Sequence, residues 1–217
     1  MDIINLSTHN SILSQYLAEI RNKDIQADRL RFRRNIERIG EIMAYEISKA
    51  FRYQPTEIQT PLGTATVQVP QDKVVIATIL RAGLPFHHGF LNYFDHAENA
   101  FVSAYRLYKD PQHFDIHIEY IASPKIDGKT LVLVDPMLAT GSSMELSYHA
   151  LKTKGVPACT HIASIIASQP AIEHIRKTFP SASTHVWCAA IDPAIDNHSY
   201  IIPGLGDAGD LAYGEKE

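Results

Sequence analysis

The chain is poor in cysteine and has no long hydrophobic run. Its two cysteines, Cys159 and Cys188, lie in apolar stretches without metal-ligand spacing, which predicts buried free thiols in a reducing compartment. No stretch approaches the ~18 to 20 apolar residues that span a bilayer. The first residues lack the basic start and apolar run of a signal peptide. The sequence therefore predicts a cytoplasmic protein that makes no membrane contact.

The sequence also has no large excess of positive or negative charge. The formal net charge is −4 at pH 7, so no overall basic field attracts nucleic acid. Four arginines lie close together at Arg31, Arg33, Arg34 and Arg38. We interpret them as the polar side of a helix with some salt bridges, and a nucleic-acid patch is the alternative. The hydrophobic fraction of 45% over 217 residues predicts one domain over residues 1–217.

Apolar periodicity predicts an α/β protein. Ile36, Ile39, Met43 and Ile47 recur at spacings of three and four, which is typical of a helix. Helices are expected at 28–51, 85–95, 142–154 and 171–179. Buried strands are expected at 74–80, 129–135, 162–167 and 185–191, and shorter or half-exposed strands at 58–69 (two, around a turn at 61–63), 101–104 and 114–120 (in a hairpin). This alternation predicts a mostly parallel sheet flanked by helices, with ligands at the carboxyl ends of its strands.

Residues 131–143 are the most informative stretch: Leu-Val-Leu-Val-Asp-Pro-Met-Leu-Ala-Thr-Gly-Ser-Ser. A buried strand ends at Asp135, a short loop follows, and a helix begins. The free N–H groups of a first helical turn and the helix dipole attract a phosphate, and a carboxylate beside them suits two adjacent sugar hydroxyls. The stretch thus predicts a sugar phosphate site. It is not a Walker P-loop, because no Gly-Lys-Ser/Thr follows the glycine. The alternative is a capped helix start only, since Ser142 and Glu145 stand at capping-box spacing.

Two arginines also follow predicted strands. Arg81 ends the run 74–80 and precedes Ala82 and Gly83, small residues that allow a ligand close to the backbone. Arg106 follows the short strand 101–104. Guanidinium groups bind phosphate oxygens bidentately, although an arginine at a strand end is more often a surface ion pair. Arg81, Arg106 and Asp135 are each expected at the carboxyl end of a strand, and therefore at one edge of the sheet.

The string Gly204-Leu-Gly-Asp-Ala-Gly209 satisfies the G-x-G-x-x-G pattern of dinucleotide-binding folds. Only seven residues follow Asp210, so the helix, second strand and distant acid of that fingerprint have no place. We interpret the string as a loop of exposed backbone N–H and C=O groups. Such groups can pair with the edge of a nucleobase and discriminate between bases that differ in their donors and acceptors.

Taken together, these strings resemble the type I phosphoribosyltransferases, and Asp-Pro-Met-Leu-Ala-Thr-Gly is similar to the form in uracil phosphoribosyltransferases. The resemblance covers nearly the whole chain. It implies a type I phosphoribosyltransferase fold with a β-hairpin hood and an N-terminal helical arm that begins near Arg21. It also implies an enzyme of pyrimidine salvage, which transfers ribose 5-phosphate from phosphoribosyl pyrophosphate (PRPP) to N1 of uracil and yields UMP and diphosphate.

The resemblance further implies Mg²⁺ as the cofactor, held mainly through PRPP and water and by no dedicated protein ligands. It implies a homodimer or a higher homo-oligomer, and it leaves open whether GTP is an effector. The residues matched to PRPP binding are Arg81, Arg106, Asp135, Pro136, Met137, Leu138, Ala139, Thr140, Gly141, Ser142, Ser143 and Asp207. Those matched to uracil binding are Ile201, Gly206, Asp207 and Ala208. Asp135, Arg106 and Asp207 are the expected catalytic residues.

Two departures from the family pattern stand out. Ser142 follows Gly141 where relatives often have a second glycine, and its backbone N–H remains available to a phosphate. Residues 107–128, which correspond to the hood, lack the acidic pair that many relatives carry after the arginine. The alternatives left open are a phosphoribosyltransferase for a purine or orotate, an RNA-binding regulator that senses UMP, and a non-catalytic binding subunit.

Overall fold

The computed structural model describes residues 1–110 and 113–215, with the backbone alone for 104–110 and 113–117. Its central sheet is formed by β1 (Asp2–Asn5), β4 (Val74–Leu80), β5 (Glu98–Asp110), β6 (His113–Ala122), β7 (Thr130–Val134), β8 (Met137–Leu138), β9 (Cys159–Ser168) and β10 (Thr184–Asp192). The strand order is β1-β10-β9-β7-β4-β5-β6, and β8 pairs with β9. All these pairings are parallel except β5 with β6. The predicted mostly parallel sheet is confirmed.

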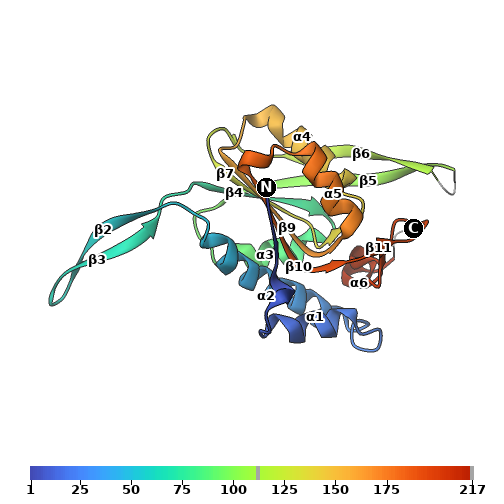
Figure 1. Ribbon diagram of the computed structural model, residues 1–217, viewed down its shortest axis with the longest axis horizontal. Helices are drawn as coiled ribbons and strands as arrows, with labels where there is room; N and C mark the ends of the chain where they lie inside the picture. Colours follow the sequence, from blue (N-terminus) through green and yellow to red (C-terminus); the bar gives the residue numbers. More distant parts are fainter. Residues whose placement is uncertain (111–112, 216–217) are drawn as a thin grey trace.

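Helices cover both faces of this sheet (Figure 1). They are α1 (Leu13–Arg21), α2 (Arg29–Ser48), α3 (Gly83–Leu91), α4 (Ser142–Leu151), α5 (Gln169–Thr178) and α6 (Ala208–Tyr213), with short 3₁₀ turns at Leu6–Thr8, Lys152–Lys154 and Ser181–Ser183. Helices α4 and α5 lie on one face, and α1, α2 and α3 lie on the other. In the described part of the chain, no helix is long and apolar enough to cross a bilayer.

The period of two along β7 divides the core into two clusters. Val132 and Val134 pack on the side of α2 and α3, whereas Leu131 and Leu133 pack on the side of α4 and α5. Every residue of β7 is buried. A strand buried on both faces needs a continuous apolar run, and this is why the sequence signal for β7 was so clear.

Most predicted elements are present, with ends that shift by a few residues. The helix expected at 28–51 is α2, which begins after Asp28, whose side chain accepts a hydrogen bond from the N–H of Arg31. The prediction omitted β1, α1 and α6. It read the whole C-terminal string as a loop, and this is wrong for residues 208–213, because Asp207 caps a short helix there.

The strand expected at 101–104 is too short, because β5 runs from Glu98 to Asp110. Strand β5 pairs with β4 as far as Ser103 and then continues with β6 alone to Asp110. The β5–β6 hairpin therefore extends beyond the body of the sheet (Figure 1). Arg106 lies within this hairpin, with its backbone opposite Ile116, and not at the end of a strand.

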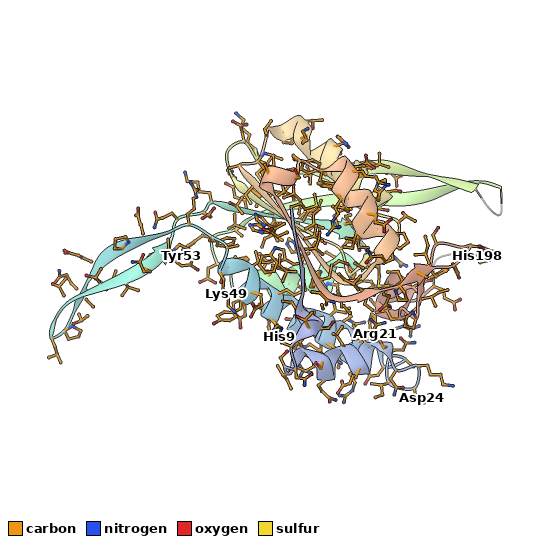
Figure 2. All side chains as sticks on the ribbon, in the orientation of Figure 1. His9, Arg21, Asp24, Lys49, Tyr53 and His198 are labelled. Carbon is orange, nitrogen blue, oxygen red and sulfur yellow. The ribbon has the colours of Figure 1, made fainter. Side chains whose placement is uncertain are left out.

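A second hairpin, β2 (Tyr53–Thr60) and β3 (Gly63–Pro70), projects away from the body of the molecule (Figures 1 and 2). Its turn lies between Thr60 and Gly63, as the sequence predicted. The two strands pair only with each other. Short strands β11 (Ala194–Ile195) and β12 (Ile201–Ile202) form a further antiparallel pair before the C-terminal helix.

Candidate active site

Asp135 directly follows β7 and is half-buried at its carboxyl end. Burial raises the pKa of its carboxyl group to about 7. The backbone N–H of Met137, 3.4 Å from Oδ1, lowers the pKa, and the nearby carboxylate of Asp207 raises it further. Asp135 and Asp207 are 72 positions apart in sequence, so the fold has brought together two carboxyl groups that the sequence analysis assigned to one site.

The loop after Asp135 is fixed to the sheet by its backbone. The carbonyl of Pro136 accepts hydrogen bonds from the N–H groups of Ile165 and Ile166, at 3.1 and 3.0 Å. The hydroxyl of Ser168 donates to the carbonyl of Ala139. The Leu138 side chain is buried in the core, so only its backbone can face a ligand. The loop is thus held rigidly at the edge where a phosphate was predicted.

Helix α4 begins directly after this loop without a side-chain cap. Its N-cap residue is Gly141, which has a φ of +85°, a backbone conformation that favours glycine. The hydroxyl of Thr140 accepts a hydrogen bond from the N–H of Ser142 at 3.3 Å. The capping-box alternative is wrong, because Glu145 instead accepts a hydrogen bond from Nε2 of His174 on α5, at 2.7 Å. The first turn of α4, with Ser142 and Ser143 half-buried, is available to an anion.

Arg81 follows β4 and reaches the C-terminal segment. Its Nη2 donates to Oδ1 of Asp210 and to the carbonyl of Gly214, each at 3.2 Å. Its Nε is buried and has no hydrogen-bond partner among the described residues. A buried guanidinium N–H without a partner is costly, so a ligand oxygen at this position would be favourable. The peptide bond between Leu80 and Arg81 is cis.

The C-terminal segment completes the site. Asp207 accepts a hydrogen bond from the N–H of Asp210 at 3.0 Å and so begins α6. A Cβ on Gly209 would lie 3.1 Å from Oδ1 of Asp207 and 3.9 Å from Nη2 of Arg81, which places the start of α6 against the loop that follows β4. The side chains of Ile201 and Ala208 are buried. Any base contact from these two positions would therefore use their backbone groups.

Arg106 cannot be placed with the others, because its side chain lies outside the described residues. The structure adds two residues that the sequence analysis did not assign. His174 lies against Gly141 in loop 136–143, since a Cβ on Gly141 would lie 2.9 Å from its Cδ2, and Asp210 binds Arg81. Asp210 directly follows the string that ends at Gly209, whereas no local signal marked His174, which lies 33 residues beyond Gly141.

The structure offers no complete metal-binding cluster of three or more His, Cys, Asp or Glu side chains within the residues it describes. Asp135 and Asp207 nevertheless provide carboxylate oxygens, the ligand type that Mg²⁺ prefers. Burial is the main cause of the raised pKa of Asp135, and the nearby carboxylate of Asp207 adds to it; a bound cation would offset both effects. These two residues therefore fit a magnesium ion that is bound together with an anionic ligand.

Solved structures with the same architecture define the class. The AQ2163 protein from Aquifex aeolicus superposes with a TM-score of 0.86 over 98% of both chains, at 27% sequence identity. A hypoxanthine phosphoribosyltransferase from Staphylococcus aureus shares the fold, with a TM-score of 0.50 over 74% of each chain and 15% identity. The fold is that of a type I phosphoribosyltransferase.

Sequence relatives define the family within this class. The family model described as uracil phosphoribosyltransferase matches residues 7–215. A uracil phosphoribosyltransferase from Porphyromonas gingivalis is 68% identical over the full length of both chains. One from Methanothermobacter thermautotrophicus is 39% identical over 94% of this chain and 93% of its own length. The chain belongs to the uracil phosphoribosyltransferase family, and the resemblance seen in its motifs is confirmed.

Proposed function

We propose that the protein transfers ribose 5-phosphate from PRPP to N1 of uracil and releases diphosphate. The observation that carries this proposal is the meeting of Asp135, the uncapped start of α4 and Arg81 beside the C-terminal segment. PRPP presents a phosphate, two ring hydroxyls and a diphosphate. These groups match a helix N-terminus, a carboxylate and a guanidinium in turn.

In the reaction, the bond between ribose C1 and the diphosphate oxygen breaks, and its electron pair leaves with diphosphate. N1 of uracil forms the new bond to C1 and loses its proton. Positive charge develops on the ribose ring, and negative charge develops on the leaving group. No covalent nucleophile is needed, so the protein acts by aligning the reactants and stabilising charge.

Each part of the site has a role in this scheme. Loop 136–143 binds the 5-phosphate, and Asp135 accepts hydrogen bonds from the ribose hydroxyls. Arg81 binds the diphosphate, which gives its buried Nε a partner. Arg106 is the second diphosphate ligand by family resemblance. Each charged hydrogen bond to phosphate contributes about 1.5–3 kcal/mol.

Uracil is read by the backbone of the C-terminal segment. The edge of the base has two carbonyl acceptors around an N–H donor, and the backbone groups of Ile201, Gly206 and Ala208 supply matching donors and acceptors. Asp207 connects this loop to PRPP, because its carboxylate lies close enough to Asp135 to raise the pKa of that residue. Cytosine has an amino donor in place of one uracil carbonyl and an acceptor nitrogen in place of the uracil N–H. The backbone groups that match uracil would therefore remain without hydrogen-bond partners.

Mg²⁺ would be held mainly through PRPP and water, and Asp135 and Asp207 are the carboxylates that would lie beside it. When bound, the ion supplies positive charge to the diphosphate as it leaves. A homo-oligomeric assembly and a cytoplasmic location stay predictions, as does an effect of GTP. A GTP titration of the initial rate tests the last of these.

The decisive experiment is UMP formation from uracil, PRPP and Mg²⁺, with cytosine, orotate and hypoxanthine as parallel substrates and EDTA as a control. We expect turnover with uracil alone, abolished by EDTA. Turnover with hypoxanthine or orotate would contradict the assigned base. An absence of turnover on every base, with PRPP still bound, would favour a sensor or a non-catalytic subunit.

A further inference from the structure

Arg21, the last residue of α1, forms a bidentate salt bridge with Asp192 at the end of β10. Nη1 and Nη2 donate to the two carboxylate oxygens of Asp192, each at 2.8 Å. Asp192 is 6% exposed, so its charge is almost fully removed from water. Figure 2 shows Arg21 between the N-terminal helices and the C-terminal segment. The planar guanidinium suits this geometry, which one lysine ammonium cannot reproduce.

The same pair of residues binds both backbone groups of Gly204. Nη1 of Arg21 donates to the Gly204 carbonyl at 3.0 Å, and the Gly204 N–H donates to Oδ2 of Asp192 at 2.9 Å. Gly204 has a φ of +55°, and a Cβ there would lie 2.2 Å from the carbonyl oxygen of Ile201. This tight turn is the start of the loop that runs through Gly206 to Ala208. The backbone of the loop is therefore oriented by an ion pair that lies outside it.

Two further residues of the N-terminal arm hold the same segment. The amide of Gln26 faces two carbonyl acceptors, so that its nitrogen donates to Leu205 at 3.0 Å and to Ile20 at 2.8 Å. On α2, Nη1 of Arg33 donates to the carbonyl of Ala212 in α6 at 2.7 Å. The arm thus contacts the C-terminal segment at Gly204 and Leu205, just before residues 206–208, and at Ala212, just after them.

We propose that Arg21 is a positioning residue for uracil, which holds the backbone of Gly204 through Asp192 so that residues 206–208 present the groups that pair with the base. This rests on the assignment of that loop to uracil under the proposed function. Arg21 does not touch the reacting atoms in this scheme. Its loss lowers the affinity for uracil and leaves the binding of PRPP to loop 136–143 intact.

The electrostatics of Asp192 agree with this role. Burial raises the pKa of its carboxyl group, but the hydrogen bonds from Arg21 and the Gly204 N–H outweigh that effect, and the net pKa lies below the ordinary value. The carboxylate therefore depends on Arg21 to remain charged in this place. Without Arg21, the buried carboxylate of Asp192 lacks its counter-charge, and the turn at Gly204 loses the hydrogen bond to its carbonyl group.

Steady-state kinetics of Arg21→Ala, Arg21→Lys and Arg34→Ala test the proposal, with uracil and PRPP varied separately. Arg34 forms an exposed ion pair with Glu37 on the same arm and serves as the matched control. We expect Arg21→Ala to raise KM for uracil about tenfold and to change KM for PRPP less than about twofold. Arg21→Lys should recover part of the loss, and Arg34→Ala should change neither constant.

An unchanged KM for uracil in Arg21→Ala, or an equal rise in both constants, would overturn the proposal. If Arg21→Ala does not fold, Gln26→Ala replaces it, because that variant keeps the ion pair and removes the bonds to Leu205 and Ile20. The same criteria then apply. Ala208→Val overpacks a buried position and so shifts the loop backbone assigned to the base, which separates this proposal from the one on which it rests. If Ala208→Val leaves KM for uracil unchanged, the loop assignment fails; if only Arg21→Ala and Gln26→Ala are silent, the positioning role alone fails.

Discussion

The carboxyl group of Asp135 stands half-buried at the end of β7, where burial raises its pKa to about 7. A carboxyl group with a raised pKa in the folded state binds its proton more tightly there than in the unfolded chain. Its contribution to stability is therefore present at low pH and is lost as pH rises from its ordinary value of 3.8 toward 7. At neutral pH the ionised carboxylate therefore lowers the stability of the fold, which is common for residues with the kind of role proposed for Asp135.

We predict that Asp135→Asn lowers kcat/KM for PRPP by at least about tenfold, because the amide cannot accept hydrogen bonds from two hydroxyls as a carboxylate does. In the wild type, kcat/KM for PRPP should rise with pH through about 7 as Asp135 ionises, and the variant should lack this step. Denaturant unfolding at pH 8 should show the variant more stable by on the order of 1 kcal/mol. Wild-type rates in the variant would contradict the role of Asp135.

Gly141 combines a positive φ with a close neighbour. A Cβ there would lie 2.9 Å from Cδ2 of His174. We predict that Gly141→Ala destabilises the protein by about 1–2 kcal/mol and raises KM for PRPP more than KM for uracil, because the phosphate loop must shift. Thermal unfolding and initial rates measure the two effects.

Gly128→Ala is the matched control for this change. Gly128 also has a positive φ, +68°, but a Cβ there would meet nothing within 4 Å. The Gly128→Ala variant should lose stability through backbone strain and keep the wild-type KM values for PRPP and uracil. A rise in KM for PRPP in the control as well would show that the effect is not specific to the phosphate loop.

At the scale of elements, the strands and helices of the sheet were predictable and the supports of the site were not. Strand β7 and helix α2 carry apolar periodicity over their whole length, so local sequence is enough. Helix α6 is six residues long and contains Gly209, which disfavours a helix; it forms because Asp207 caps it and α2 packs against it. Two arginines of α2 form the expected salt bridges, in the pairs Arg31–Glu19 and Arg34–Glu37, whereas Arg33 donates to the carbonyl of Ala212.

The Arg21–Asp192 pair joins α1 to β10 and gives a prediction about pH. The pKa of Asp192 is net lowered in the folded state, so its charged form stabilises the fold above its ordinary value of 3.8, and this contribution is lost as pH falls below that value. We expect Asp192→Asn to reduce the free energy of unfolding by about 2 kcal/mol at pH 7, with a smaller difference near pH 3.5. Urea unfolding at several pH values measures this. The exposed residue Asp95 provides the control variant, Asp95→Asn, and a difference that stays constant with pH would contradict the account.

At the scale of the whole molecule, the β2–β3 hairpin stands apart from the core (Figure 1). Its register places four apolar side chains on one face: Ile58, Ala65, Val67 and Val69. Ile58 and Val67 are 43% and 47% exposed. A two-stranded hairpin alone is marginally stable in water, and an exposed apolar face of this kind is typical of a subunit contact. This supports the predicted homo-oligomer.

We predict that the double variant Ile58→Glu and Val67→Glu shifts the protein toward a monomer in size-exclusion chromatography with light scattering. Charges on an apolar contact face must be desolvated or repel each other. Thr66→Glu and Gln68→Glu, on the opposite face of the same hairpin, should leave the molar mass unchanged. A monomeric wild type, or an unchanged mass in the first variant, would contradict an assembly through this face.

What the sequence by itself determined is the part of the protein whose signals are local. The buried strands and the strand–acid–loop–helix string at 131–143 depend on residues within a few positions of one another, and they sufficed for the fold class and the family. The turn of the β2–β3 hairpin was equally local.

Only the tertiary structure decided which distant groups meet. The closeness of Asp135 to Asp207, the contact of His174 with Gly141 and the hold of Arg21 on Gly204 join segments far apart in the chain. The extension of β5 past Ser103 likewise depends on pairing with β6 rather than on its own residues. Side-chain contact, burial and the pKa shifts that follow from them are properties of packing, which no local pattern specifies.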